Sequence, residues 1–315
     1  MNWKVKVAIQ AGLACLPFGE SINYLLQNLK GSHSPSNIRR WIGEQAKTVA
    51  LAGKYASLRD AVVVEIGTGW DPTNTLLLFL AGAREIYTYD LQRHLRFEGV
   101  KRSINELRRC APLVSSVLKI SEGTIESKLR GLEQATLDET LKCAGICYRA
   151  PVDATATGLP DRSVDMVCSY AVLEHVPRET VDALTKESKR ILKPGGVAVH
   201  AIGLQDHYSC NDPHLSQIHF LRYPEWQWKI FAKNRIHYQN RLRETQYFEI
   251  FTSAGATVIS SRHRVEQRDI QEAGRMTLDR QFSELSAEEL AVNYSEIVLG
   301  FEGAQKAQAK RSGAA

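Results

Sequence analysis

Short apolar runs that end in turn residues mark the middle of this chain. Ala61–Ile66 is an apolar run rich in β-branched residues, and it ends in a turn that contains Gly67 and Gly69. A helix-length segment and a second short apolar run ending at Asp90 follow. Such a run is typical of a buried strand, and the glycines let the backbone turn sharply and approach a ligand closely. Segment 61–90 therefore predicts the first half of a nucleotide-binding β-α-β unit.

The alternation of strand-like and helix-like segments continues towards the C-terminus. Further strands are expected at 146–152, 164–170, 197–202, 256–262 and 294–301, and helices at 38–58, 177–192 and 244–254. The long interval 91–145 has helical patterns and no recognisable chemistry, so we expect extra helices there. Strands that alternate with helices in this way predict an α/β fold.

The N-terminal segment contains an apolar run, 7–18, that is shorter than the roughly 20 residues needed to span a bilayer. We expect an amphipathic helix that continues beyond Pro17 to Leu26 and packs on the core. Peripheral contact with a membrane surface, or with a partner, is the alternative, and the sparse basic charge nearby disfavours it. The tail from Gly303 is rich in Ala, Lys and Gln, and we expect it to be disordered.

The composition permits a sizeable core and only a moderate attraction for anions. The 315 residues are 43% hydrophobic and carry a net charge of +5. This charge allows an acidic substrate, but it is far below that of a dedicated nucleic-acid binder. Six scattered cysteines indicate reduced thiols and a cytoplasmic protein. Cys143 and Cys147 have no second pair and no nearby histidine, so no metal site is expected there.

The residues around the glycine turn discriminate between cofactors. Glu65 precedes the first glycine, Pro72 stands where a dinucleotide fingerprint has its third glycine, and Asp71 lies where pyrophosphate would need bare amides. Negative charge at this turn favours a cofactor that has no phosphate and carries a cationic sulfonium. Asp90, at the end of the second strand, would accept hydrogen bonds from a ribose diol.

Four motifs carry a family resemblance. EIGTG, the strand-end Asp90, PVDATATGLPDRSVDMVCSYAVLEHV and ILKPGG resemble, in that order, the successive motifs of class I S-adenosylmethionine-dependent methyltransferases. The resemblance runs from about Ala61 to Ala201 and returns near the C-terminus. One departure is Asp71, where many members have a third glycine.

The resemblance implies a Rossmann-like seven-stranded sheet with helices on both faces. We expect an N-terminal helical extension (1–58), a methyltransferase domain (59–302) with a helical lid or substrate insertion (203–243) after the fifth strand, and a disordered tail (303–315). The implied cofactor is S-adenosyl-L-methionine. Its expected contacts are Glu65, Gly67, Thr68, Gly69, Asp90, Leu91, Asp153, Ala154 and Tyr170. In the family's pattern the Asp153 carboxylate accepts from the adenine amine and the next backbone amide donates to the ring.

Methyl transfer to an oxygen requires a group that takes the acceptor's proton. His175 is the first candidate base, because the segment after the fourth strand faces the cofactor in this fold, and His207, beside Asp206, is the second. A structural role for either histidine is an equal alternative. Glu174–His175 also resembles the end of an ExxEH metal motif whose first glutamate is Ala171 here. No metal is therefore expected unless a lid histidine replaces that glutamate.

The segment after the fifth strand is dense in His, Trp, Tyr, Lys and Arg. It predicts either a nucleic-acid face, on which bases stack, or a lid over a small-molecule pocket, and we favour the lid. Aromatic residues that pack the lid itself would account for Trp226 and Phe231 equally well. The expected acceptor contacts are Asp206, His214, His219, Tyr238, Arg241 and Arg243.

These patterns predict an enzyme that transfers a methyl group to a small-molecule acceptor. The lid pattern is similar to methyltransferases of bacterial surface-polysaccharide and natural-product biosynthesis, so the expected acceptor is an oxygen of a saccharide, a lipid-linked or a natural-product intermediate. The alternatives are an RNA methyltransferase, a nicotinamide oxidoreductase, which Pro72 and the LKPGG segment disfavour, and an inactive methyltransferase-like binding protein.

Overall fold

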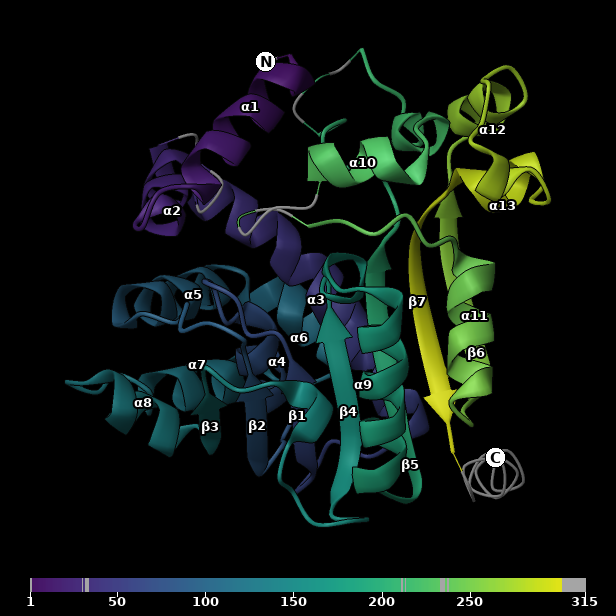
Figure 1. Ribbon diagram of the computed structural model, residues 1–315. Helices are drawn as coiled ribbons and strands as arrows, with labels where there is room; N and C mark the ends of the chain where they lie inside the picture. The colour runs from purple at the N-terminus through teal and green to yellow at the C-terminus, as the bar shows by residue number, and fades with distance from the viewer. Residues whose placement is uncertain are drawn as a thin grey trace.

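The computed structural model describes residues 2–29, 31, 34–210, 212, 214–232, 236 and 238–301. Its centre is a seven-stranded sheet with the strand order β3-β2-β1-β4-β5-β7-β6 (Figure 1). The strands are β1 (Val62–Ile66), β2 (Glu85–Tyr89), β3 (Ile146–Arg149), β4 (Val164–Tyr170), β5 (Leu192–Gly203), β6 (Thr257–Val265) and β7 (Val292–Gly300). β7 runs antiparallel to both of its neighbours, and the pairs among β1 to β5 are parallel. The predicted fold class is confirmed.

Helices cover both faces of the sheet (Figure 1). One face packs against α3 (Pro35–Tyr55), α4 (Thr73–Leu80), α5 (Phe97–Arg109), α6 (Ala111–Leu118), α7 (Glu122–Arg130) and α8 (Leu137–Cys143), and the other against α9 (Arg178–Ile191) and α11 (Glu244–Ser253). In β1, Val63 belongs to the first core, whereas Val62 and Val64 belong to the second. The continuous apolar run therefore follows from burial on both faces.

A third core lies above the carboxyl ends of the central strands. It joins Trp3 of α1 (Trp3–Ala14) to Trp228 of α10 (Glu225–Ala232) and to Tyr208, Phe220 and Phe282. α12 (Gln267–Ala273) and α13 (Ala287–Ala291) lie at the same end of the molecule (Figure 1). The segment after β5 and the N-terminal helix thus pack on each other through aromatic side chains. Phe231 packs against Trp3 in this core, as the aromatic-packing alternative expects, whereas Trp226 is exposed.

The N-terminal segment differs from the single helix expected from its pattern. α1 ends at Ala14, and α2 (Gly19–Leu29) begins after a turn that contains Pro17. Proline lacks an amide hydrogen and clashes with the preceding helical turn, which explains the break. Trp3 packs in the third core rather than on the sheet, while Phe18, Leu25 and Leu29 are exposed.

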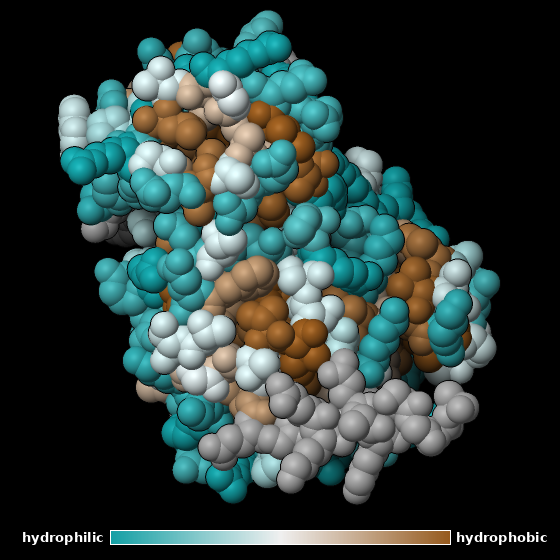
Figure 2. Space-filling model, turned by 90° about the vertical axis from the view of Figure 1, so that its right-hand side faces the viewer, coloured by the Kyte–Doolittle hydropathy of each residue, from teal (hydrophilic) through white to brown (hydrophobic). Residues whose placement is uncertain are grey.

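No helix in the described ranges is long and apolar enough to cross a bilayer. On the side of the molecule that carries β6 and α11, polar side chains separate the apolar surface into patches (Figure 2). The tail 303–315, which we expect to be disordered, lies outside the described residues.

Candidate active site

A cavity of about 860 Å³ lies at the carboxyl ends of the central strands. Its floor comes from the segments that follow β1, β2, β3 and β4, and its roof comes from α1, α2 and the segment after β5. The carboxyl ends of parallel strands are where ligands bind in open α/β sheets. This volume is in the range of cofactor and small-molecule sites.

Six of the nine residues expected to contact the cofactor line this cavity: Gly67, Asp90, Leu91, Asp153, Ala154 and Tyr170. They come from four different loops, which the sheet brings to one edge. Glu65, Thr68 and Gly69 are not among the lining residues. Their contacts show what these three residues do instead.

The glycine turn is close-packed. Gly67 has a φ of +80°, and a Cβ placed on it would lie 2.5 Å from Cγ2 of Val172. A side chain at this position is therefore disfavoured both by backbone conformation and by space. Gly69 also has a positive φ, and its amide donates to Oδ2 of Asp90 at 3.2 Å. The turn is thus tied directly to the end of β2.

Glu65 is buried and holds the start of α4. Its carboxylate accepts hydrogen bonds from Asn74 Nδ2 at 2.6 Å, Thr75 Oγ1 at 2.5 Å and Thr88 Oγ1 at 2.8 Å. Burial raises the pKa of Glu65, and these three donors oppose the rise. Thr68 Oγ1 lies 2.5 Å from Thr88 Oγ1 in the same network. The network sets the angle between β1 and α4 and so shapes the turn.

The negative charge of Asp71 is partly balanced by an arginine. Its Oδ1 lies 2.8 Å from Nη2 of Arg102 on α5. A paired carboxylate repels a neighbouring anion less than a bare one does. Asp71 would therefore repel a pyrophosphate group less than the sequence alone indicates. The nature of the cofactor is indicated by the other motifs instead.

Asp90 is the titratable group in the part of the cavity where the cofactor is expected. Burial raises its pKa to about 7, the Gly69 amide works against the rise, and the nearby Glu65 adds to it. A carboxyl with this pKa is partly protonated near neutral pH. Ligand hydroxyl groups donate to the ionised carboxylate, so ligand binding would lower the pKa of Asp90.

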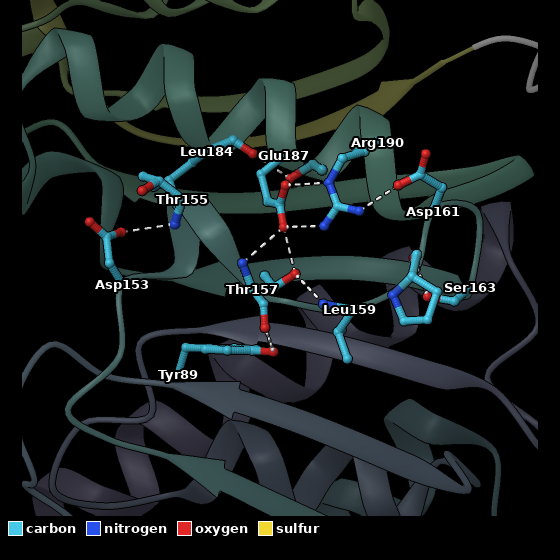
Figure 3. Close-up of polar contacts among 12 residues, drawn as sticks. Tyr89, Asp153, Thr155, Thr157, Leu159, Asp161, Ser163, Leu184, Glu187 and Arg190 are labelled. Atoms are coloured by element: carbon cyan, nitrogen blue, oxygen red, sulfur yellow. Dashed lines mark hydrogen bonds and ion pairs between the residues drawn. The ribbon is translucent and has the colours of Figure 1, made fainter.

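The loop after β3 is held by an ionic network (Figure 3). Asp153 is exposed at the cavity, and its Oδ1 accepts from the Thr155 amide at 2.8 Å. Glu187 on α9 accepts from the amide and the hydroxyl of Thr157 at 2.9 and 2.5 Å. Arg190 joins Glu187 to Asp161. The loop that presents Asp153 and Ala154 is thus fixed to α9.

At the other end of the cavity, Glu174, His175 and His207 come together. The ring centroids of the two histidines are 4.9 Å apart. Each of the three residues offers one ligand atom, and these atoms lie within 4.8 Å of one another. Both candidate bases named from the sequence therefore occupy one place, with the buried Glu174 beside them.

The lid packs directly on this cluster. Asn240 Nδ2 donates to the carbonyls of Leu173 and Val176 at 2.7 and 2.8 Å, and the Asn240 amide donates to the Glu174 carbonyl at 2.8 Å. The carbonyl of Tyr238 accepts from Nδ1 of His175 at 2.7 Å. The segment 238–240 thus holds the turn that carries Glu174 and His175.

Of the six residues expected to contact the acceptor, Tyr238 alone lines the cavity. His214 is exposed elsewhere, and His219 packs against Trp3 with a ring-centroid distance of 5.5 Å. Burial lowers the pKa of His219 to about 4. Asp206 is buried, its Oδ1 accepts from the Tyr208 amide at 2.8 Å, and burial raises its pKa to about 7. These three side chains belong to the lid's own structure.

Arg241 and Arg243 correct the expectation that they would reach the acceptor. Arg243 is fully buried and donates to the carbonyls of Leu204, at 2.7 Å, and Val292. Arg241 donates to the carbonyls of Phe220, at 3.0 Å, and Tyr223, and it pairs with Glu225 at 2.7 Å. Both guanidinium groups satisfy backbone carbonyls inside the protein. An arginine that binds a ligand and an arginine that binds backbone carbonyls look the same in the sequence.

Several cavity residues lie outside the motifs recognised in the sequence. The cavity is also lined by Trp41 of α3, Tyr294 of β7, and Lys6 and Gln10 of α1. They come from elements far from the recognised motifs. They reach the cavity through the packing of α1 and α3 and the pairing of β7 with β5, which leave no local sequence pattern.

Comparison with known proteins adds a family match. A family model described as "Methyltransferase domain" matches residues 118–200. No curated protein sequence matches the chain significantly. The matched range includes Asp153, Glu174 and His175.

Among solved structures, the chain is similar to an S-adenosylmethionine-dependent methyltransferase from Listeria monocytogenes, with 12% identity, 81% of this chain and 97% of that chain covered, and a TM-score of 0.42. It is similar to an S-adenosylmethionine-dependent methyltransferase from Mesorhizobium loti, with 15% identity, coverage of 81% and 97%, and a TM-score of 0.43. A third is geranyl diphosphate C-methyltransferase from Streptomyces coelicolor, with 13% identity, coverage of 85% and 84%, and a TM-score of 0.45. At these TM-scores the likenesses add no weight to the assignment.

The antiparallel seventh strand between β5 and β6, the order of the motifs and the family match lead to one conclusion. The protein is an S-adenosylmethionine-dependent methyltransferase with the class I fold, and its cofactor is S-adenosyl-L-methionine.

Proposed function

We propose that this enzyme transfers the methyl group of S-adenosyl-L-methionine to an oxygen of a small molecule bound beneath the lid. The observation that carries the proposal is a single cavity with two chemically different ends. Asp90 and Asp153 line one end, and Glu174, His175 and His207 line the other. Methyl transfer requires donor and acceptor in one enclosed space.

The cofactor end fits S-adenosyl-L-methionine in shape and charge. The Gly67 turn has no space for a side chain, because a Cβ would lie 2.5 Å from Cγ2 of Val172, so the bare backbone faces the ligand. The Asp90 carboxylate would accept from the two ribose hydroxyls, and Asp153 with the Ala154 amide would pair with the adenine edge. Glu65, Thr68 and Gly69 position the turn, since their hydrogen bonds are made within the protein.

The acceptor end provides a proton acceptor. The cofactor supplies a methyl group on a cationic sulfur, and an acceptor hydroxyl must lose its proton as its oxygen attacks. Nδ1 of His175 is held by the Tyr238 carbonyl, so its Nε2 carries the lone pair that takes this proton. His207, 4.9 Å away between ring centroids, is placed to receive or share it. The segment 238–240 packs against this end, where the His175 side chain remains exposed.

The acceptor side of the cavity favours a small molecule over RNA. Ile9, Leu26 and Trp41 offer apolar surface, and Lys6, Gln10 and Gln205 offer polar groups. Such a mixed lining suits a saccharide, a lipid-linked intermediate or a natural product with an apolar part. α1, α2 and the described residues of the segment after β5 act as the roof of the site. All six cysteines are free, which supports a reducing, cytoplasmic location.

The test combines cofactor titration with product analysis. Calorimetry should show binding of S-adenosyl-L-methionine and none of NAD, and mass spectrometry should find a methyl gain on a member of a panel of sugars, lipids and natural products. His175→Ala should lower kcat about 10²–10⁴-fold with unchanged cofactor affinity. His214→Ala, a lid histidine away from the cavity, is the matched control. NAD binding, or methylation of RNA alone, would refute the proposal.

A further inference from the structure

We propose that Glu174, His175 and His207 form a three-ligand site for a divalent transition-metal cation, with an open coordination position towards the acceptor. Their ligand atoms all lie within 4.8 Å of one another. In a zinc site, ligand atoms about 2.0–2.2 Å from the metal lie roughly 3–4 Å apart. Cation binding would therefore draw these ligand atoms closer together.

The carboxylate of Glu174 is the observation that points to a ligand. Glu174 is 2% exposed, and its Oε1 accepts from the Gly203 amide at 3.0 Å. Oε2 is buried and has no hydrogen-bond partner among the described residues. A buried carboxylate oxygen without a partner is costly, and a cation between it and two imidazoles would remove that cost.

The orientation of His175 is that of a metal ligand. Its Nδ1 donates to the Tyr238 carbonyl at 2.7 Å, so the proton is on Nδ1 and the lone pair is on Nε2. Metal-binding histidines usually donate their other ring nitrogen to a carbonyl or carboxylate in this way. The Asn240 side chain fixes the backbone of the same turn on both sides of His175. The ligand is therefore preorganised by the lid.

The donor set indicates the kind of cation. Two imidazoles and one carboxylate suit Zn²⁺, Fe²⁺, Co²⁺ or Mn²⁺, whereas Mg²⁺ and Ca²⁺ prefer oxygen ligands alone. Three protein ligands leave a position open, as in catalytic zinc sites. Because these residues line the cavity, the open position faces the space assigned to the acceptor. The sequence expectation of no metal depended on Ala171, and His207 supplies the third ligand instead.

The cation gives the proposed function a narrower acceptor class, and this part of the inference rests on that function. An oxygen donor such as a hydroxyl beside a second oxygen would occupy the open position. A bound cation would occupy the Nε2 lone pair of His175, so His175 would no longer take the proton of the acceptor. The cation would instead lower the pKa of the bound acceptor hydroxyl, and that proton would pass to water.

The experiment uses the full chain, stripped of metal with a chelator, at neutral pH. Calorimetric titration with Zn²⁺ should show one equivalent bound. His207→Ala and Glu174→Gln should each weaken binding by about 100-fold or more, since loss of even an outer partner costs 10–100-fold. His214→Ala, an exposed lid histidine outside the cluster, should bind as the natural protein does. Circular dichroism establishes that each variant is folded.

Cobalt spectroscopy separates this site from the free cysteines. Co²⁺ bound by nitrogen and oxygen gives d–d bands without a thiolate charge-transfer band. No binding by the natural protein, equal binding by His207→Ala, or a thiolate band would each overturn the proposal. Titration with S-adenosyl-L-methionine is read independently. Zn²⁺ binding without cofactor binding would refute the proposed function and leave the metal site standing.

Discussion

The sharpest prediction concerns the pH dependence of cofactor binding through Asp90. The carboxyl lies at the end of β2 in the cavity, and burial raises its pKa to about 7 in the ligand-free protein. A ribose diol donates two hydrogen bonds and needs the ionised carboxylate to accept them. Binding therefore lowers the pKa of Asp90, and below neutral pH a proton must leave when the cofactor binds.

The size of the effect follows from the pKa. With a free-protein pKa of about 7 and a complex pKa well below 6, the ionised fraction rises from about 1/11 at pH 6 to about 10/11 at pH 8. Cofactor affinity should therefore rise about tenfold across this range and level off above it. Asp90→Asn should remove this rise and weaken binding at pH 8 by about 1–3 kcal/mol, the value of hydrogen bonds to a charged group.

Stability should show the opposite slope. The raised pKa means that folded protein binds the Asp90 proton more tightly than unfolded protein does. The stability associated with this proton is complete below the unfolded pKa, about 3.9, and is lost as pH rises towards 7. Thermal unfolding of the ligand-free protein, compared with Asp90→Asn, measures this loss.

Isothermal titration calorimetry from pH 6 to 8, in buffers of different ionisation enthalpy, measures both affinity and protons released. The cofactor's own amino group titrates near pH 8, but it does so for both proteins and cancels in their difference. If the natural protein and Asp90→Asn had the same pH profile, Asp90 would not be the ribose acceptor. Another residue would then have to accept hydrogen bonds from the ribose.

Two further predictions test the turn and the lid. Gly67→Ala should weaken cofactor binding at least about tenfold, because left-handed backbone costs roughly 1–2 kcal/mol and the new Cβ meets Val172. The double variant with Val172→Ala should recover only the affinity lost through the clash with Val172. Unchanged calorimetric affinity in Gly67→Ala would contradict this prediction. Arg243→Ala should lower the free energy of unfolding by about 3–5 kcal/mol, because two buried carbonyls lose their donors. Denaturant unfolding measures the loss, and unchanged stability with altered acceptor kinetics would instead support the direct contact predicted from the sequence.

The strands were predictable because burial determines their composition. The expected strand at 164–170 coincides with β4, and Val167 and Met166 are completely buried on opposite faces. A capping box of Ser286 and Glu289 starts α13, as a serine followed by a glutamate three residues later indicates. In both cases the determining interactions are local in sequence or follow from alternation between faces.

The lid was not predictable in the same way, because its residue types have two uses. An arginine can bind an acidic ligand or satisfy backbone carbonyls, and composition does not distinguish the two. Arg243 is fully buried against carbonyls that lie 39 and 49 residues away in sequence. Long-range pairing of this kind leaves no local pattern.

The histidine cluster lies between these cases. His175 follows β4 and His207 follows β5, and β4 and β5 are neighbouring parallel strands. Residues just beyond the carboxyl ends of adjacent parallel strands meet at one edge of the sheet, so topology alone predicts that these two side chains are close. The sequence supplied the two histidines as alternatives, whereas the sheet makes them partners. Glu174 joins them because its carboxylate turns inward to the Gly203 amide at the end of β5. The proposed metal site therefore takes its third ligand from beyond the neighbouring strand, where a pattern sought within one loop does not extend.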